Sequence, residues 1–221
     1  MITETIHNLI EAIVDTDRVK ALEIIWLALE KGITPEQVVF DVILPATEQL
    51  IGSSCDDSDL SLAQHFIISQ IAGEVTEAMI PLFKTAPLPA GRVVIGTSLG
   101  DFHGLGKKIV TGALKAQMVD VIDLGLNVPA HRFVEEAINR NAQIIAISSM
   151  MVHTARGENG PLKVRKLLKN AGLENQIKIV VGGAPYVYDE QLYRTVNADA
   201  WAPNGILAAK VIVNLINELK K

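Results

Sequence analysis

The sequence predicts an α/β protein in which an N-terminal four-helix bundle precedes a parallel sheet of the Rossmann-like or flavodoxin-like type. Residues 1–84 show only helical periodicity in their apolar positions, whereas residues 91–221 alternate short apolar runs with amphipathic segments. Apolar runs without polar alternation are typical of strands buried on both faces, as in parallel sheets covered by helices. Residues 85–90 contain two prolines and no charge, and we interpret them as the linker.

Four helices are expected in the first domain. The first two carry apolar residues at helical spacing: Ile6, Leu9, Ile10 and Ile13, then Val19, Leu22, Trp26 and Leu29. Thr34 and Pro35 are expected to provide the N-cap and first turn of the third helix. The fourth is expected over residues 60–83, after a polar loop at residues 52–59. Amphipathic helices joined by short connections predict an antiparallel bundle.

The second domain is expected to contain five strands that alternate with helices. The predicted strands are 93–97, 119–123, 144–148, 177–181 and 198–201, and the predicted helices are 109–117, 130–139, 161–168, 186–195 and 203–219. In open parallel sheets, ligands bind in the loops that follow the carboxyl ends of the strands. The functional residues are therefore expected in these loops.

The composition excludes several classes of protein. The net charge is −5, from 20 basic and 25 acidic residues, and no basic block is present, so nucleic-acid binding is not expected. A single cysteine, Cys55, excludes an internal disulfide and indicates a reducing, cytoplasmic location. Short, interrupted apolar runs predict no membrane span, and His7 and Glu11 within the N-terminal segment argue against a signal peptide.

The loop after the first predicted strand carries the most informative residues: Asp101, Phe102, His103, Gly104, Leu105 and Gly106. Here a histidine stands between a strand and a helix, two residues after an aspartate. A carboxylate that accepts one ring N–H of a histidine fixes the tautomer and leaves the other nitrogen free to bind a metal. The glycine spacing differs from that of a dinucleotide fingerprint, so a nicotinamide cofactor is not favoured.

Three more loops are expected at the same edge of the sheet. The loop at residues 123–129 turns into a helix and offers little obvious chemistry. The loop at residues 148–154 contributes small hydroxyls, thioethers and a valine: Ser148, Met150, Val152 and Thr154. The fourth loop begins with small residues that let a bulky group approach the backbone: Gly182, Gly183 and Ala184. Each loop alone has an ordinary structural explanation, but their convergence around His103 predicts a ligand site.

In this order and on this fold, the segments Asp-x-His-x-x-Gly, Ser-x-Met and Gly-Gly resemble the motifs of the cobalamin-binding domain. The preceding bundle resembles the cap domain of the methyl-carrying corrinoid proteins, as in methionine synthase and in corrinoid subunits of methanogen and acetogen methyltransferase systems. The resemblance covers nearly the whole chain. Three features depart from it: Met150 replaces the usual leucine, Gly104 replaces a frequent acidic residue, and residues 53–60 lack the aromatic side chains typical of the cap.

The resemblance implies a role for each loop residue. His103 matches the lower axial ligand of cobalt, in the base-off/His-on state in which it replaces the cofactor's own base, and Asp101 and Thr154 match its hydrogen-bond chain. The residues that match the surroundings of the displaced nucleotide tail are Ser148, Met150, Gly182, Gly183, Ala184 and, at its far side, Ala202. The other expected cofactor contacts are Phe102, Gly104, Leu105, Gly106 and Val152.

The function that the resemblance implies is methyl transport by a non-catalytic carrier subunit. A substrate-specific methyltransferase would load a methyl group onto the cobalt, from a methylamine, methanol or an aryl methyl ether. An acceptor methyltransferase would pass it to tetrahydrofolate or a thiol, and a reductive activator is expected as a further partner. Because the cap and a partner cannot cover the methyl face together, the linker at residues 85–90 is the expected hinge.

Three alternatives stay open at this point. The chain could be a cobalamin-binding sensor, the small subunit of a cobalamin-dependent mutase, or an α/β domain for another ligand. Sensors generally add a DNA-binding segment, and mutase subunits generally lack a helical cap of this type, so neither matches well. Several cationic side chains outside the motifs are interpreted as surface groups: His65, Lys107, Lys108 and His153.

Overall fold

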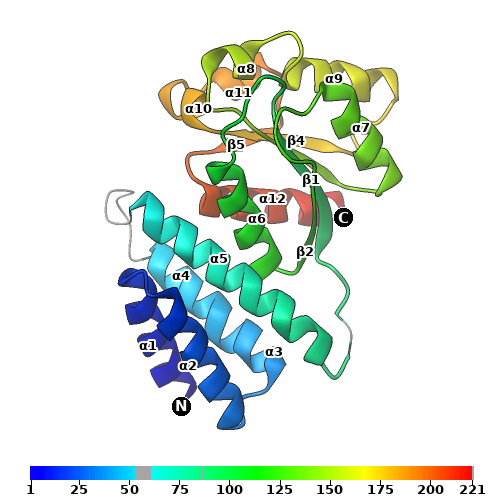
Figure 1. Cartoon of the computed structure of the whole chain (residues 1–221). Helices are drawn as coiled ribbons and strands as arrows, with labels where there is room; N and C mark the ends of the chain where they lie inside the picture. Colours follow the sequence, from blue (N-terminus) through cyan, green and yellow to red (C-terminus); the bar gives the residue numbers. More distant parts are fainter. Residues whose placement is uncertain (53–60, 86, 221) are drawn as a thin grey trace. The chain divides into compact units, whose positions relative to one another are not determined.

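The computed structural model describes residues 1–52, 61–85 and 87–220, and these form two compact units (Figure 1). The first unit comprises Met1–Leu88 with Gly112–Met118, and the second comprises Pro89–Thr111 with Val119–Lys221. The change from one unit to the other after Leu88 falls within the expected linker. The grouping of residues 112–118 with the helical unit is not predicted by the sequence.

The helical unit follows the predicted order. Its elements are α1 (Ile2–Val14), α2 (Arg18–Glu30), the consecutive segments α3 (Pro35–Gln37), η1 (Val38–Ile43, π-helical) and α4 (Leu44–Gly52), then α5 (Leu62–Met79) and the 3₁₀ turn η2 (Ile80–Leu82). Thr34 caps α3 as predicted, because its hydroxyl accepts from the Gln37 N–H. Of the polar loop expected at residues 52–59, all but Gly52 lies outside the described residues.

The buried face of α2 differs from the prediction. The side chains that it buries are those of Ala21, Ile25 and Ala28, whereas Val19 and Trp26 are 64% and 49% exposed. This helix is apolar on more than one side, so its periodicity alone does not select the face that packs. The small alanine side chains let α2 approach α1 and α5, and that close contact decides the orientation.

The second unit is built on a five-stranded parallel sheet. Its strands are β1 (Gly91–Thr97), β2 (Val119–Asp123), β3 (Ile144–Ser148), β4 (Lys178–Gly182) and β5 (Ala200–Ala202), in the spatial order β2-β1-β3-β4-β5. This is the flavodoxin-like order, so the structure decides between the two sheet types that the sequence predicts. The strand order reverses between β1 and β3, which places the expected ligand site at the carboxyl ends of these two strands.

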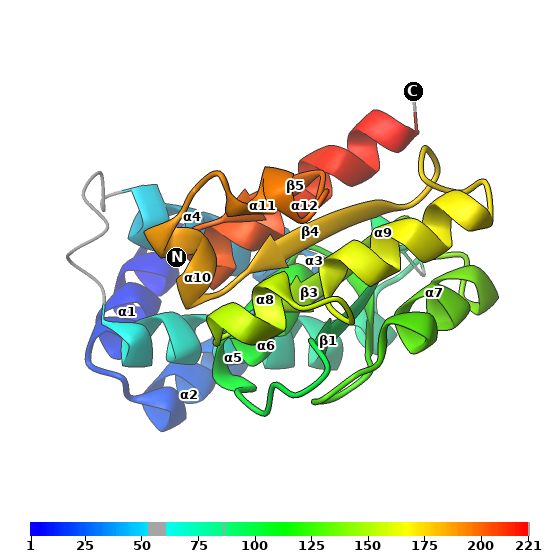
Figure 2. The same ribbon diagram turned by 90° about the horizontal axis from the view of Figure 1, so that it is seen from above.

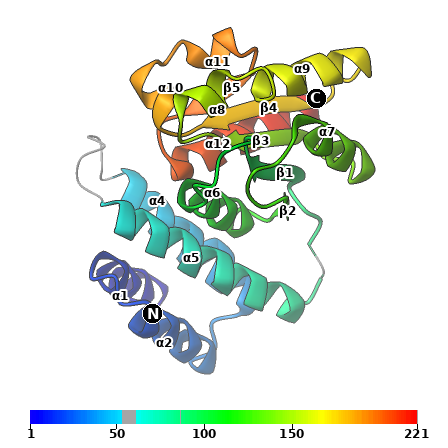
Figure 3. The same cartoon turned by 45° about the horizontal axis from the view of Figure 1, so that its top comes forward.

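Helices cover both faces of this sheet (Figures 2 and 3). One face carries α6 (Leu105–Ala116) and α12 (Gly205–Leu219), and the other carries α7 (Ala130–Asn139), α8 (Val152–Arg156), α9 (Pro161–Asn170), α10 (Ala184–Tyr188) and α11 (Leu192–Thr195). The core on the second face is continuous from Val94 through Phe133, Ile145 and Leu168 to Tyr186. Among the residues that the structure describes, no helix is both long and apolar enough to cross a membrane.

Three helices of this unit differ from the prediction. The helix expected at residues 109–117 begins one turn earlier, at Leu105. The helix expected at residues 186–195 is split into α10 and α11, because Asp189 leaves the helical conformation and its Oδ1 accepts from the Gln191 N–H. In the loop predicted at residues 148–154, α8 begins at Val152, and the N–H of Thr154 bonds to the carbonyl of Met151. This short helix brings the Thr154 hydroxyl back toward the end of β1.

Candidate functional site

The carboxyl ends of four strands form one row across the sheet. Thr97 pairs with Ser148, Ser148 with Gly182, and Gly182 with Ala202. Three of these four positions are predicted site residues, and all four side chains are small or absent. Ser148 and Gly182, in the middle of the row, are partly exposed, whereas Thr97 and Ala202 at its ends are buried.

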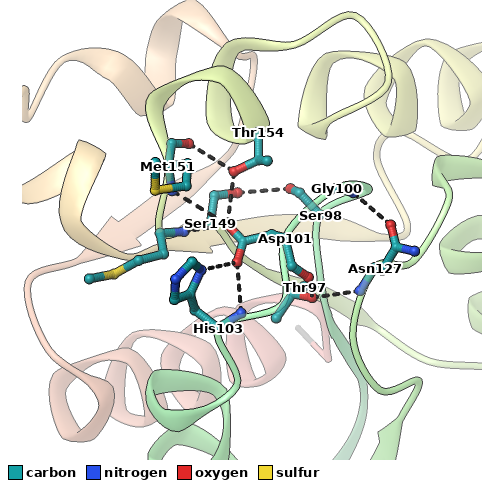
Figure 4. A network of polar contacts seen from close by, with 10 residues as sticks. Thr97, Ser98, Gly100, Asp101, His103, Asn127, Ser149, Met151 and Thr154 are labelled. Atoms are coloured by element: carbon teal, nitrogen blue, oxygen red, sulfur yellow. Dashed lines mark hydrogen bonds and ion pairs between the residues drawn. The ribbon is translucent and has the colours of Figure 1, made fainter.

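Asp101 is the centre of the polar contacts above this row (Figure 4). Its Oδ1 accepts from the backbone N–H of His103 and lies 3.0 Å from Nδ1 of the same residue. Its Oδ2 accepts from the Met150 N–H at 2.6 Å, the Thr154 hydroxyl at 2.8 Å and the Met151 N–H at 3.4 Å. The carboxylate thereby joins the loop after β1 to the loop after β3, across the switch point of the sheet.

Asp101 is 1% exposed, and these hydrogen bonds decide whether its carboxyl group is ionised. Burial by itself raises the pKa of Asp101, but the hydrogen bonds from the His103 and Met150 N–H groups, the Thr154 hydroxyl and the His103 ring outweigh it. The pKa of this carboxyl is therefore held below its usual value. At neutral pH the group is ionised and accepts on both oxygens, as the donors around it require.

His103 is held on one side only. Its side chain is 58% exposed, and the contact with Asp101 fits the tautomer that carries its proton on Nδ1. Nε2 points away from the carboxylate (Figure 4) and is free to bind a metal from the open side. Within the described ranges no three His, Cys, Asp or Glu side chains gather around a possible metal position, so His103 is a single candidate ligand.

Apolar side chains surround this histidine without being covered by protein. The exposed apolar residues on the two loops that Asp101 joins are Leu99, Phe102, Leu105, Met150, Met151 and Val152. Met150 reaches Asp101 through its backbone, while its side chain is 49% exposed. Clustered exposed apolar groups indicate a surface that a ligand or a partner covers. Four of these six residues, Phe102, Leu105, Met150 and Val152, are predicted cofactor contacts, and Leu99 and Met151 are not.

The predicted glycines serve different purposes. Gly183 has φ +115°, and a Cβ on it would lie 2.1 Å from the Ser149 carbonyl oxygen, so the backbone itself requires glycine before Ala184 starts α10. A Cβ on Gly182 would meet no atom closer than the Ala202 oxygen at 3.9 Å. Gly182 thus leaves space open above the row of strand ends.

The two glycines of the first loop, in contrast to Gly183, both leave room for a side chain. A Cβ on Gly104 would lie 3.0 Å from the Leu126 side chain, which is tight but adjustable. A Cβ on Gly106, in the first turn of α6, would meet nothing within 4 Å. Neither glycine is required by the protein packing alone.

Lys107 is not the surface charge that the sequence predicts. Its side chain is 4% exposed, and its ammonium is paired with the carboxylate of Asp123 at the end of β2. The first turn of α6 packs against the neighbouring strand end, which buries the lysine and supplies its counter-ion. Lys108 and His153 are exposed, as predicted, whereas His65 is only partly exposed, with its Nδ1 3.2 Å from the Ser61 carbonyl oxygen.

The loop after β2 also contributes more than the sequence predicts. Asn127 accepts a hydrogen bond from the Gly100 N–H at 2.7 Å through its side-chain oxygen, and its own N–H bonds to Thr97 Oγ1 at 2.8 Å. A signal in the sequence is the Asn itself, because asparagine favours the left-handed conformation that it adopts here, with φ +55°. The partner of its side chain, far away in the sequence, could not be read from it.

Comparisons with known proteins identify the family of the chain. The B12 binding domain family matches residues 91–209. Trimethylamine corrinoid protein 1 of Methanosarcina acetivorans is 34% identical over 189 residues, which cover 84% of this chain and 86% of that protein. Dimethylamine corrinoid protein 3 of the same organism is 31% identical over 208 residues, 90% of this chain and 91% of that protein.

Two solved structures show the same fold. A cobalamin-binding protein from Desulfitobacterium hafniense has a TM-score of 0.74 at 21% identity and covers 95% of this chain and 98% of its own. The methanol:cobalamin methyltransferase complex of Methanosarcina barkeri has a TM-score of 0.75 at 22% identity, over 97% of this chain and 80% of that chain. With the matched domain and the curated relatives, these findings show that the chain belongs to the B12-binding family and, within it, to the corrinoid proteins.

Proposed function

We propose that this chain is the methyl-carrying corrinoid subunit of a methyltransferase system that uses methylamines. The observation that carries the proposal is the Asp101–His103 pair at the switch point of a flavodoxin-like sheet. The names of the relatives, trimethylamine and dimethylamine corrinoid proteins, favour a carrier over the sensor, mutase and unrelated-ligand alternatives.

The described residues fit a corrinoid. His103 offers Nε2 on an open, apolar surface, and the row of small residues at the strand ends leaves the space that a Cβ on Gly182 would fill. In the proposed base-off/His-on state, His103 would bind the cobalt in place of the cofactor's own base. The residues proposed to line the displaced nucleotide tail are Ser148, Met150, Gly182, Gly183, Ala184 and Ala202. When bound, the cobalt supplies the acceptance and release of the methyl group, which no side chain provides.

The chain's own residues set the state of the imidazole. Asp101 accepts on Oδ1 from the ring of His103, which favours the tautomer with the proton on Nδ1 and leaves Nε2 as the nitrogen that can bind a metal. Thr154 and the Met150 N–H hold the carboxylate so that it cannot turn away from the ring.

The partners follow from the carrier role. A substrate-specific methyltransferase loads the protein, an acceptor methyltransferase passes the methyl group to a thiol or tetrahydrofolate, and a reductive activator restores the reactive cobalt state. Residues 1–84 are proposed to act as the cap, residues 91–221 as the cobalamin-binding domain and residues 85–90 as the hinge. This role places the protein in the cytoplasm, where these partners act.

Methyl loading tests this proposal. The full chain, reconstituted with cobalamin and reduced, is mixed in turn with methyltransferases for trimethylamine, dimethylamine, monomethylamine and methanol, each with its own substrate. We expect one of the amine combinations to change the corrinoid absorption spectrum and to release one demethylated amine per methyl group loaded. Mixtures without the methyltransferase are the control. Bound cobalamin that is methylated in none of the amine mixtures would contradict the proposal, and loading by methanol alone would contradict the substrate class.

A further inference from the structure

We infer that Asn127, in the loop after β2, is a positioning residue that sets the loop carrying Asp101 and His103. It acts through the main chain of Gly100 and Asp101, and neither the resemblance nor the motifs single it out. The inference rests on the proposed role of His103 as the metal ligand. It follows that the loop after β2, which supplies no metal ligand, controls the position of the His103 imidazole relative to the metal.

The hydrogen bonds of Asn127 enclose the start of the cofactor loop (Figure 4). The side-chain oxygen accepts from the Gly100 N–H at 2.7 Å, and the backbone N–H donates to the Asp101 carbonyl at 3.0 Å and to Thr97 Oγ1 at 2.8 Å. The Thr97 hydroxyl in turn donates to the same Asp101 carbonyl at 2.6 Å. The peptide groups on both sides of Asp101's amide are thereby fixed from the β2 side.

This arrangement constrains the Asp101 side chain as well as its backbone. The carboxylate of Asp101 is bonded toward His103 through Oδ1 and toward Thr154 through Oδ2, so it has little freedom to compensate for a moved backbone. A displacement of the Gly100–Asp101 peptide therefore changes the 3.0 Å contact between Oδ1 and the imidazole. The Asn127 side chain holds the preceding peptide through the Gly100 N–H, and the Asn127 N–H holds the following one through the Asp101 carbonyl. The Asp101 N–H itself bonds to the Ser98 carbonyl, so Asn127 limits the displacement from both flanking peptides.

A second contact from the same loop supports this function. Asp123, at the start of the loop, is paired with Lys107, just beyond the other end of the cofactor loop. The segment from Gly100 to Lys107 is thus tied at both ends to residues 123–127. Gly100, with φ +82°, and Asn127, with φ +55°, are both in the left-handed region that makes this close approach of two turns feasible.

Two substitutions of Asn127 distinguish the contribution of its side-chain oxygen from that of its backbone conformation. Asn127→Gly keeps the left-handed conformation but removes the acceptor for the Gly100 N–H, whereas Asn127→Asp keeps an oxygen in the same place. Asn141→Gly is the matched control, because Asn141 is also left-handed, with φ +52°, and lies before β3 at the opposite end of the sheet. Urea unfolding of each cofactor-free variant verifies that it is folded.

The readouts are the dissociation constant for cobalamin and the share of the divalent cobalt signal that shows nitrogen splitting from a protein imidazole, both on the full chain. We expect Asn127→Gly to weaken binding by about three- to tenfold, as loss of one hydrogen bond predicts, and to lower the share with imidazole bound. Asn127→Asp and Asn141→Gly should stay close to the wild type.

Three other outcomes would each overturn a specific part of this inference. Wild-type values for Asn127→Gly in both readouts would overturn the positioning role while leaving the proposed ligand His103 intact. Equal losses in Asn127→Gly and Asn127→Asp would overturn the role of the side-chain acceptor. Absence of imidazole splitting in the wild type itself would instead overturn the His-on assignment, and this inference with it.

Discussion

Replacing Asp101 by asparagine is expected to lower the free energy of unfolding of the sheet unit by about 2–4 kcal/mol. The substitution keeps the volume but replaces one acceptor oxygen by an NH₂ donor. Every group around the carboxylate is a donor: the N–H and ring of His103 on Oδ1, and the Met150 N–H and Thr154 hydroxyl on Oδ2. Either orientation of the amide therefore sets donor against donor in a buried position.

The two tryptophans of the chain allow this effect to be measured in one unit. Trp26 belongs to α2 and Trp201 to β5. Because Trp26 is 49% exposed, Trp26→Phe should be tolerated, and urea unfolding can then be followed by Trp201 fluorescence alone. Asp189→Asn is the control, since its ion pair with Arg156 is largely exposed and should contribute less than about 1 kcal/mol. Equal stability of the two variants would contradict the role given to Asp101.

The difference in free energy of unfolding between the wild type and Asp101→Asn is expected to depend on pH. The pKa of Asp101 is lowered in the folded protein, so between the folded value and the unfolded value of about 3.9 the unfolded chain binds more protons. The stabilisation by this carboxylate is thus complete above about pH 4 and is lost as the pH falls through the folded value. The difference in free energy of unfolding between the cofactor-free wild type and Asp101→Asn should therefore shrink as the pH is lowered. A difference that stays constant with pH would contradict the stabilising role of the ionised carboxylate.

Gly183→Ala is expected to destabilise the sheet unit by roughly 2–6 kcal/mol, the sum of backbone strain and a steric clash. At φ +115° and ψ 172°, Gly183 is in a region that is nearly exclusive to glycine. The added Cβ would also lie 2.1 Å from the Ser149 carbonyl oxygen. A backbone oxygen cannot move aside as a flexible side chain would, and the loop that carries Met150 would have to shift.

The neighbouring glycine provides a matched control with a different expected result. Gly182→Ala meets nothing closer than 3.9 Å, so its free energy of unfolding should stay within about 1 kcal/mol of the wild type. If Gly182 lines the proposed cofactor tail, the same change should weaken cobalamin binding. Unfolding measured on Trp201, with cobalamin titration beside it, separates the two glycines. Similar stability of Gly183→Ala and Gly182→Ala would contradict the account of the backbone.

The sequence predicts most of the sheet because its signals are local. Each buried strand is a short apolar run, and Asp101, His103 and Thr154 are recognisable from the motif that they share with the cobalamin-binding domain. The structure confirms that Asp101 joins the other two through hydrogen bonds. The order of the strands in the sheet cannot be predicted in this way, because no local signal specifies which strands are neighbours. The structure was needed to select the flavodoxin-like arrangement.

The unpredicted features depend on contacts between distant residues. Lys107 is expected at the surface because lysine opposes the dipole of a helix N-terminus, but Asp123 on the neighbouring strand supplies the compensating charge. Asn127 lies in a loop without evident chemistry until Gly100 is placed beside it. In α2 the buried face carries Ala21, Ile25 and Ala28, although the helix has apolar residues on other sides as well. These outcomes follow from packing, which periodicity does not record.

The most direct test of the account is electron paramagnetic resonance of the divalent cobalt form, in full-length protein labelled with nitrogen-15 and loaded with unlabelled cobalamin. A nitrogen-15 ligand splits each cobalt line into a doublet, whereas unlabelled nitrogen from the cofactor's own base gives a triplet. We predict doublets in the wild type and in His153→Ala, an exposed histidine used as control, and their loss in His103→Ala. Triplets in the wild type, or doublets that persist in His103→Ala, would contradict the assignment of His103 as the metal ligand.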